Sequence, residues 1–325
     1  MNTPRENFIR ALECKPVAGR VPHFELVFFL TMEAFGRVHP TQRNLNKWDQ
    51  MSARERKLHL RDAADLYVQT AQTYEHSAIF IHPPVGGDEA LLEVADNIRD
   101  ISGDRYFLMH HGDCTFGIPD GSHMCDFSYR IADDPAGLHR DAENGLAWAL
   151  ARAEKIKAHG GFDGFALCSD YCLNAGPFLS PAQFGEFVTP YLARLNQAYR
   201  DMGFYVIKHT DGNIMPILDQ LVQSNPHALH SLDPQGGVDL GAVKKTYGGR
   251  VCLIGNVNCG LLQTGTDQQV VDDVRRSLRD GMAGAPGYIF STSNCVYTGM
   301  PLERYHLMLD VWKEHGNHET GAKPC

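Results

Sequence analysis

Short apolar runs bounded by glycine, proline and polar residues recur along the whole chain, and segments with helical periodicity lie between them. Runs with apolar side chains at consecutive positions are typical of strands buried on both faces of a parallel sheet. Their short length and the flanking turn residues favour strands over buried helices. We therefore predict eight strands, at residues 21–28, 77–83, 105–110, 162–170, 204–209, 228–233, 251–256 and 287–293.

Sequence signatures of helix starts lie between the predicted strands. Thr3 and Glu6 form a capping-box pair with proline at the first helical position, which predicts a short N-terminal helix through about Glu13. The same spacing predicts helix starts at Ser180 and Thr266. Strands that alternate with helices predict an α/β fold, a (β/α)8 TIM barrel with an N-terminal helical extension. An open doubly wound sheet is the alternative, but no GxGxxG motif follows the first strand.

Composition narrows the class of protein. A chain of 325 residues, 43% of them hydrophobic, suits one large barrel, so we expect a single domain over residues 1–325. The net charge of −9 disfavours nucleic acid and anionic membranes as partners, because both attract basic surfaces. No apolar run approaches the ~20 residues of a membrane span, and the N-terminus has no secretory signal pattern. We expect a cytoplasmic protein whose nine scattered cysteines are thiols.

The active sites of such barrels lie at the carboxyl ends of the strands. Glu25 is the most unusual of the polar residues predicted there, because it lies within the apolar run HFELVF and an unpaired buried charge is costly. It either forms a structural ion pair or hydrogen bond, or serves the site directly. The other strand-end residues are His23, His82, His110, His111, Asp170, Cys172, His209, Asp211, Asp233, Asn256, Asn258, Ser293, Asn294 and Cys295.

His209 and Asp211 are two apart on an extended segment, so their side chains should point to the same side. The alternative is a structural turn at Asp211 with a packed histidine before it. Cys295 follows the last strand and could reach across the mouth, although a lone cysteine is more often an inert packing residue. Zinc accepts imidazole, thiolate and carboxylate ligands, and catalytic sites use three of them. We predict a zinc site of His209, Cys295 and one of Asp211, Asp233 or Glu25.

Four segments spread over nearly the whole chain carry a resemblance to a known family. They are RENFIRALECKPVAGRVPHFE, SDYCLNAGPFLSPAQFGEFVTPYL, HTDGNIMPILDQLVQ and SLDPQGGVDLGAVKKTYGGRVCLIGNVN. Together they resemble the uroporphyrinogen decarboxylase superfamily, which contains the decarboxylases and the corrinoid-linked methyltransferases. The resemblance implies the same (β/α)8 barrel as the strand count.

Particular positions favour the methyltransferase branch. The decarboxylases carry an arginine-rich clamp for substrate carboxylates after the first strand, where this chain reads ELVFFLTMEAFGR. The methyltransferases hold zinc with a His-x-Cys pair after the fifth strand and a cysteine after the eighth. His209, Asp211 and Cys295 match these positions, with a carboxylate in place of the middle thiolate. Asp233 rivals Asp211 as third ligand, because cobalamin-independent methionine synthases place a glutamate ligand at a comparable position.

The resemblance implies a zinc-dependent methyltransferase subunit of the O-demethylase type. It would transfer a methyl group from a methoxylated aromatic, or a similar small-molecule donor, to the Co(I) corrinoid of a partner protein, because no corrinoid-binding motif occurs in this sequence. With few thiolate ligands, zinc is more electron-poor and better able to polarise an ether. Glu25 or Asp170 would orient the substrate or supply a proton. The expected substrate-binding residues are Phe28, Tyr171, Asn256 and Tyr297.

Three alternatives stay open on the sequence. A cofactor-free lyase would decarboxylate its substrate with a strand-end aspartate and would need no metal. The opposite reaction would carry a methyl group from a methylcorrinoid to a thiol, which the missing second thiolate disfavours. A non-catalytic binding barrel would tolerate replacement of each strand-end residue. The sequence also leaves homodimer formation open.

Overall fold

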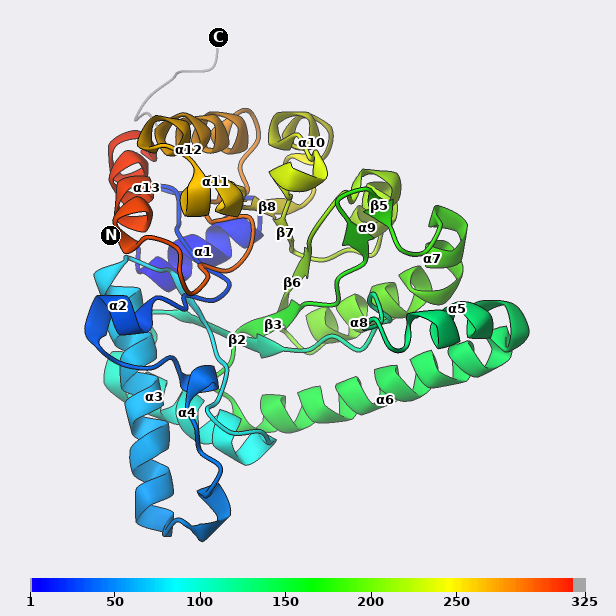
Figure 1. The fold of residues 1–325 in the computed structure, drawn as a ribbon, viewed down its shortest axis with the longest axis horizontal. Coiled ribbons are helices and arrows are strands. Elements are labelled where there is room, and N and C mark those ends of the chain that lie inside the picture. The colour runs from blue at the N-terminus through cyan, green and yellow to red at the C-terminus, as the bar shows by residue number, and fades with distance from the viewer. Residues whose placement is uncertain (1, 318–325) are drawn as a thin grey trace.

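The computed structural model describes residues 2–317 and contains a curled, fully parallel sheet of seven strands. The strands follow the order β1-β2-β3-β6-β7-β8-β9, so each strand lies beside the next one along the chain (Figure 1). Parallel neighbours of this kind require a crossover between strands, which the helices provide. The strands are β1 (Ala78–Phe80), β2 (Phe107–His111), β3 (Gly164–Leu167), β6 (Tyr205–Thr210), β7 (Ala228–Ser231), β8 (Cys252–Ile254) and β9 (Tyr288–Ile289).

The first predicted strand, residues 21–28, closes the sheet into a barrel. His23 forms parallel bridges to both His76, which precedes β1, and Phe290, which follows β9. The Phe24 N–H also donates to the Phe290 carbonyl over 3.1 Å. This segment forms isolated bridges instead of a continuous ladder. All eight predicted runs therefore lie in the barrel wall, and the predicted fold class is confirmed.

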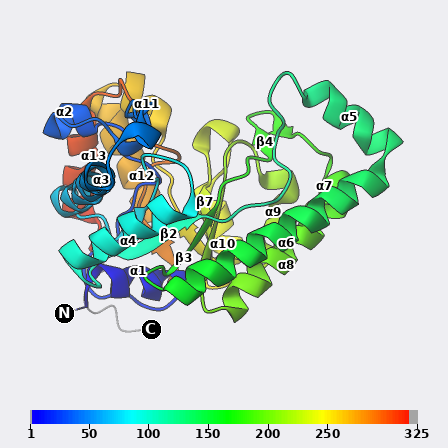
Figure 2. The same ribbon diagram turned by 90° about the horizontal axis from the view of Figure 1, so that it is seen from below.

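Helices surround the wall, and α6 and α8 run side by side along it (Figure 2). The three predicted capping boxes are confirmed at Thr3, Ser180 and Thr266, where each hydroxyl accepts the N–H three residues on. A hairpin of β4 (Cys172–Leu173) and β5 (Gly176–Pro177) stands apart from the barrel sheet. The α-helices are α1 (Pro4–Leu12), α2 (Thr31–Phe35), α3 (Ala53–Thr73), α4 (Asp88–Ser102), α5 (Met124–Asp133), α6 (Pro135–His159), α7 (Pro181–Phe187), α8 (Thr189–Asp201), α9 (Leu218–Gln223), α10 (Leu240–Tyr247), α11 (Cys259–Thr264), α12 (Asp267–Met282) and α13 (Leu302–His315). Short 3-10 helices are η1 (Pro40–Gln42), η2 (Trp48–Gln50), η3 (Met215–Ile217) and η4 (Pro234–Gly236).

The N-terminal helix α1 closes one end of the barrel. Its buried Phe8 packs against Phe24 and Phe107, with ring centroids 5.8 and 4.9 Å apart. The Arg5 N–H donates to the carbonyl of Arg105, just before β2, so α1 lies at the amino ends of the strands. The carboxyl ends form the opposite, functional end. The barrel interior between them holds apolar residues that include Phe24, Phe80, Met109, Ala166, Ile207, Ala228, Ile254 and Ile289.

Two expectations about the whole chain can be compared with the structure. No helix within residues 2–317 has the length and apolar character that crossing a bilayer requires. The eight cysteines in that part of the chain are free thiols, as predicted, and the ninth, Cys325, lies outside the described residues.

Several histidines are buried in the wall and beneath the helices. Desolvation disfavours the charged imidazole and lowers the pKa of His23 and of His76 to about 3. The unfolded chain, with histidine pKa values near 6.5, therefore binds protons between pH 6.5 and 3 that the folded chain does not. The contribution of these histidines to stability is present above pH 6.5 and is lost as the pH falls.

We predict that His76→Gln makes the free energy of unfolding less dependent on pH between 4.5 and 6. Removal of one buried titrating group should reduce the slope by about 1.4 kcal/mol per pH unit. Urea unfolding at a series of pH values measures the slope. His306→Gln, an exposed neighbour on α13, is the control and should leave it nearly unchanged. Equal slopes in wild type and His76→Gln would contradict the prediction.

Candidate metal centre

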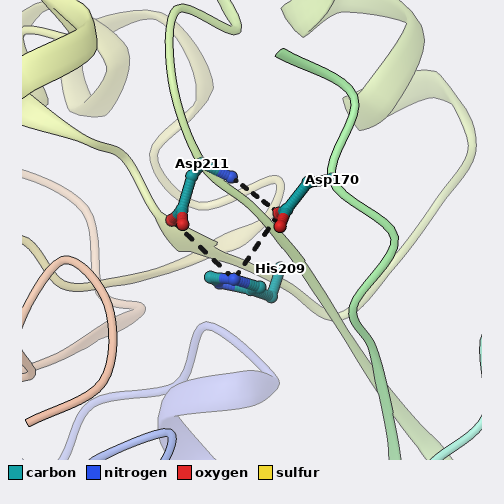
Figure 3. Close-up of side chains that lie close together, drawn as sticks. All are labelled: Asp170, His209 and Asp211. Atoms are coloured by element: carbon teal, nitrogen blue, oxygen red, sulfur yellow. Dashed lines mark hydrogen bonds and ion pairs between the residues drawn. The ribbon is translucent and has the colours of Figure 1, made fainter. Parts of the chain in front are cut away.

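Three side chains converge where β3 and β6 end. One ligand atom from each of Asp170, His209 and Asp211 lies within 4.8 Å of the others. The His209 Nε2 is 3.7 Å from a carboxylate oxygen of Asp170 and 3.7 Å from one of Asp211 (Figure 3). Two carboxylates and one imidazole are ligands that divalent cations accept.

The alternation of β6 places two of these residues. Ile207 points into the barrel interior, so His209 and Asp211 lie on the same side, as predicted. The chain then turns at Gly212, whose φ of +75° favours glycine and whose Cα approaches the Cys172 carbonyl so closely that a Cβ would lie 2.6 Å from it. The Asp211 N–H donates to the Asp170 carboxylate over 3.2 Å, which joins the two strand ends.

His209 has one ring nitrogen available for a ligand. Its Nδ1 lies 2.8 Å from Nδ1 of His230, while its Nε2 points to the carboxylates. Burial, with a contribution from Lys208, lowers the pKa of His209 to about 3. The imidazole is therefore neutral at physiological pH, which is the form that binds metals.

The two carboxylates differ in their surroundings. Burial, together with the charges of Asp170 and Asp233 and against a hydrogen bond from Ser231, raises the pKa of Asp211 to about 7. Asn294 Nδ2 also donates to the Asp211 carboxylate. Burial likewise raises the pKa of Asp170, although 47% of its side chain is exposed and forms the open side of the group. A bound cation would offset the repulsion between the two carboxylates, so the donor set fits a divalent metal such as zinc.

A buried ion pair lies next to the candidate metal group. Lys208 Nζ donates to the Asp113 carboxylate and to the Ser169 carbonyl, both over 2.8 Å, and lies 4.0 Å from the centroid of the Tyr171 ring. Burial alone would raise the pKa of Asp113, but the charge and hydrogen bond of Lys208 and the hydrogen bonds from Thr115 together outweigh it, and the net shift is downward. Sequence reasoning missed this pair. The signal was a lysine within the apolar run YVIKHT.

Comparisons with known proteins agree with this fold. Residues 166–315 match the family model of uroporphyrinogen decarboxylase (URO-D). The matched segment contains the three residues of the candidate metal centre. No curated protein matches the sequence significantly.

A solved methyltransferase from Methanosarcina mazei is similar over 97% of this chain and 99% of its own, with a TM-score of 0.73 and 16% identity. At this identity the likeness concerns the fold. More distant barrels include a GH5_18 from Bifidobacterium longum subsp. infantis, with a TM-score of 0.46 at 9% identity over 92% of this chain and 80% of that one. N-acetylneuraminate lyase from Fusobacterium nucleatum has a TM-score of 0.40 at 10% identity, over 78% and 73%.

The other predicted ligands lie near the group but outside it. Cys295 follows Asn294, whose side chain donates to the Asp211 carboxylate and accepts the Cys295 N–H, so this cysteine lies next to the site. Burial, with the charges of Cys259 and Asp211, raises the pKa of its thiol to about 12. The Asp233 carboxylate caps η4 by accepting the Gln235 N–H over 2.9 Å. Metal ligation by Cys295 or Asp233 stays a prediction. Asp170, predicted as a catalytic residue, is one of the three residues of the candidate metal group, and its catalytic role stays a prediction.

Glu25 has the partner that its burial requires. Its Oε1 is 3.0 Å from His23 Nε2, and its Oε2 accepts the Thr292 N–H and hydroxyl over 3.1 and 2.5 Å. Burial raises the pKa of this carboxyl to about 7. The structural alternative for Glu25 is thus realised, and direct contact with substrate stays a prediction.

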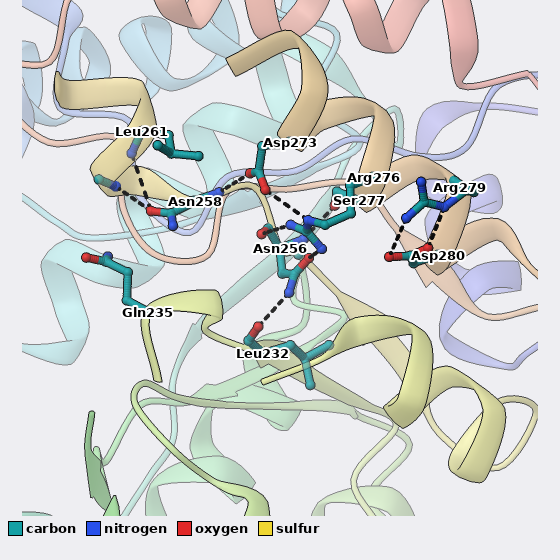
Figure 4. A network of polar contacts seen from close by, with 12 residues as sticks. Leu232, Gln235, Asn256, Asn258, Leu261, Asp273, Arg276, Ser277, Arg279 and Asp280 are labelled. Atoms are coloured by element: carbon teal, nitrogen blue, oxygen red, sulfur yellow. Dashed lines mark hydrogen bonds and ion pairs between the residues drawn. The ribbon is translucent and has the colours of Figure 1, made fainter. Parts of the chain in front are cut away.

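The four predicted substrate-binding residues have different surroundings. Phe28 is buried against Tyr74, and the buried Tyr171 hydroxyl bonds that of Thr115 over 2.5 Å. Asn256 is fully buried: its Nδ2 donates to the Leu232 carbonyl and its Oδ1 accepts from Arg276, which ties β8 to α12 (Figure 4). Only Tyr297 of the four is substantially exposed, at 38%. Substrate contact stays a prediction for all four, and the exposure of Tyr297 makes it the most accessible.

We predict that Lys208→Met destabilises the protein by about 3–5 kcal/mol, because it leaves the buried Asp113 carboxylate without its cation. The double variant Lys208→Met/Asp113→Leu should recover a large part of the loss. Urea unfolding at neutral pH measures both. Arg61→Met, which breaks the exposed pair with Asp100, is the control and should cost little. A Lys208→Met cost no larger than that of Arg61→Met would contradict the prediction.

Proposed function

We propose that this protein is a zinc-dependent methyltransferase subunit. It transfers a methyl group from a methoxylated aromatic, or a similar methyl donor, to the Co(I) corrinoid of a partner protein. The observation that carries the proposal is the convergence of His209 Nε2 with the carboxylates of Asp170 and Asp211 at the carboxyl ends of β3 and β6. The fold shared with a methyltransferase from Methanosarcina mazei supports it.

Asp170, His209 and Asp211 would hold the metal, and the Cys295 thiol lies close by, next to Asn294. Bound zinc would supply Lewis acidity that makes the donor's oxygen or nitrogen a better leaving group. The chain contributes the orientation of the ligands. Ser231 Oγ donates to Asp211 over 2.7 Å, and the Lys208 bond to the Ser169 carbonyl immobilises the backbone next to Asp170.

Exposed apolar side chains beside the site support a docking partner. Leu173, on β4 directly after the Asp170 segment, is 54% exposed, and Met215, on η3 directly after the Asp211 segment, is 44% exposed. Methyl transfer to a corrinoid requires that the partner protein covers this end of the barrel. Apolar residues at the rim would lose water on docking, which favours association.

A metal-free lyase is the second candidate, and two observations favour it. The matching family model is that of a decarboxylase. Asp211, with its pKa raised to about 7, is suited to donate a proton to a carbanion at neutral pH. This candidate predicts turnover of a carboxylated substrate without any metal.

We expect about one zinc per wild-type chain by elemental analysis, and its loss in His209→Ala and Asp211→Asn. Methylation of a Co(I) corrinoid by methoxyaromatics, followed by visible absorbance, should fall in both variants by more than the about 10–100-fold typical of an outer-shell partner. Cys295→Ala, compared with the exposed Cys125→Ala as control, tests the thiolate. Wild-type protein that holds no zinc and cannot be loaded would favour the metal-free lyase.

A further inference from the structure

Behind His209, a row of buried side chains continues away from the candidate metal centre. His209 Nδ1 is 2.8 Å from His230 Nδ1 on β7, and His230 Nε2 is 3.3 Å from Ser291 Oγ, just after β9. Ser291 Oγ donates to Glu25 Oε2 over 3.4 Å. Each of these side chains is almost completely buried. Because water is excluded, the position of each hydrogen in this row is determined by the hydrogen bonds between neighbouring side chains.

The far end of the row fixes the first proton. Glu25 Oε1 is 3.0 Å from His23 Nε2, and His23 Nδ1 is 3.0 Å from the Tyr74 carbonyl. A carbonyl oxygen can only accept, so His23 Nδ1 carries hydrogen. With its hydrogen on Nδ1, a neutral His23 has only a lone pair on Nε2, so the hydrogen of the 3.0 Å contact resides on Glu25 Oε1. Burial, which lowers the pKa of His23 and raises that of Glu25, acts in the same direction. Glu25 Oε1 then donates to His23, while Oε2 accepts the Thr292 N–H and can accept the Ser291 hydroxyl.

The direction of the single hydroxyl hydrogen of Ser291 determines which ring nitrogens of His230 and His209 carry hydrogen. When it points to Glu25 Oε2, Ser291 Oγ accepts from Nε2–H of His230, and Nδ1 of His230 is left as an acceptor. His209 must then carry its hydrogen on Nδ1. Its Nε2 lone pair is free toward Asp170 and Asp211.

The opposite arrangement would disable the ligand. If Ser291 donated to His230 Nε2, the hydrogen on His230 Nδ1 would point at His209, and His209 Nε2 would carry hydrogen. A protonated ring nitrogen cannot bind a cation. The orientation of the Ser291 hydroxyl, which Glu25 accepts, therefore determines whether His209 Nε2 can bind a metal.

We infer that Ser291 and Glu25 are positioning residues that hold His209 in the Nδ1–H tautomer through His230, so that Nε2 faces the metal centre ready to bind. The inference rests on the proposed role of His209 as a ligand and extends it to residues that do not touch the metal. Outer-shell hydrogen bonds of this kind orient metal-binding histidines and tune their affinity.

The tautomer can be read directly by NMR. We expect the ¹⁵N shifts of histidine-labelled protein, with His209 identified by its loss in His209→Gln, to show a protonated Nδ1 and an unprotonated Nε2 without metal. In Ser291→Ala the Nε2–H form should become populated, and Zn²⁺ affinity from a competition titration should fall about 10–100-fold. Ser293→Ala removes another buried hydroxyl nearby, which bonds Cys259 instead, and should change neither readout.

Glu25 offers a second, sharper comparison. Glu25→Gln keeps one acceptor and one donor, as in the protonated acid, and should preserve both the tautomer and the Zn²⁺ affinity. Glu25→Leu removes both and should behave like Ser291→Ala, whereas Ser291→Thr retains the hydroxyl and should behave like wild type. Circular dichroism and urea unfolding establish that each variant is folded.

An Nε2–H tautomer of His209 in the metal-free wild type would overturn the inference, as would unchanged shifts and affinity in folded Ser291→Ala. Both results are independent of methyl transfer. A wild type with the expected tautomer but no corrinoid methylation would contradict the proposed function and leave the inference intact.

Discussion

The cost of burying polar groups without partners governs the functional end of this barrel. Its strands are short and their carboxyl ends carry charged and polar side chains that the surrounding helices and loops cover. Each such group needs a hydrogen bond or an opposite charge, because desolvation without compensation costs several kcal/mol. Lys208 meets this need with Asp113, and Glu25 with His23 and Thr292. The arrangement of partners, more than the strands themselves, determines which groups remain available for chemistry.

The irregular first strand is essential to this arrangement. Residues 21–28 touch both neighbours through isolated bridges, so the sheet closes without a long ladder at that seam. Closure brings Glu25 against Thr292, which follows β9 and is 267 positions away in the sequence. The carboxyl group thereby joins Ser291, and through His230 the candidate ligand His209. The same contacts that close the barrel therefore also position Glu25 and Ser291 behind His209.

The sequence contained most of the fold and part of the site. Eight apolar runs and three capping boxes sufficed for the barrel, because consecutive burial and helix-start chemistry are local properties. Pairing of His209 with Asp211 followed from strand alternation. The place of Asp170 did not, because it depends on the register of two strands: Leu167 pairs with Lys208, which brings Asp170 opposite Asp211. Register and loop paths are tertiary properties, and for the same reason the Lys208–Asp113 pair could not be read from residues 95 positions apart.

The distribution of charge gives the strongest physical reason to expect a cation at the centre. Within residues 2–317, Asp170 and Asp211 have no lysine or arginine within ion-pair distance. The titratable side chain beside both is His209, whose imidazole is neutral. Lys208 is near, but Asp113 already neutralises it. Ser231 and Asn294 supply only uncharged donors to Asp211. Two carboxylates held together with raised pKa values and no cation of the protein are in a state that either a proton or a metal ion must relieve. In the metal-dependent methyltransferase a metal ion relieves the repulsion, and in the metal-free lyase a proton does. The zinc content of the protein therefore distinguishes the two functions.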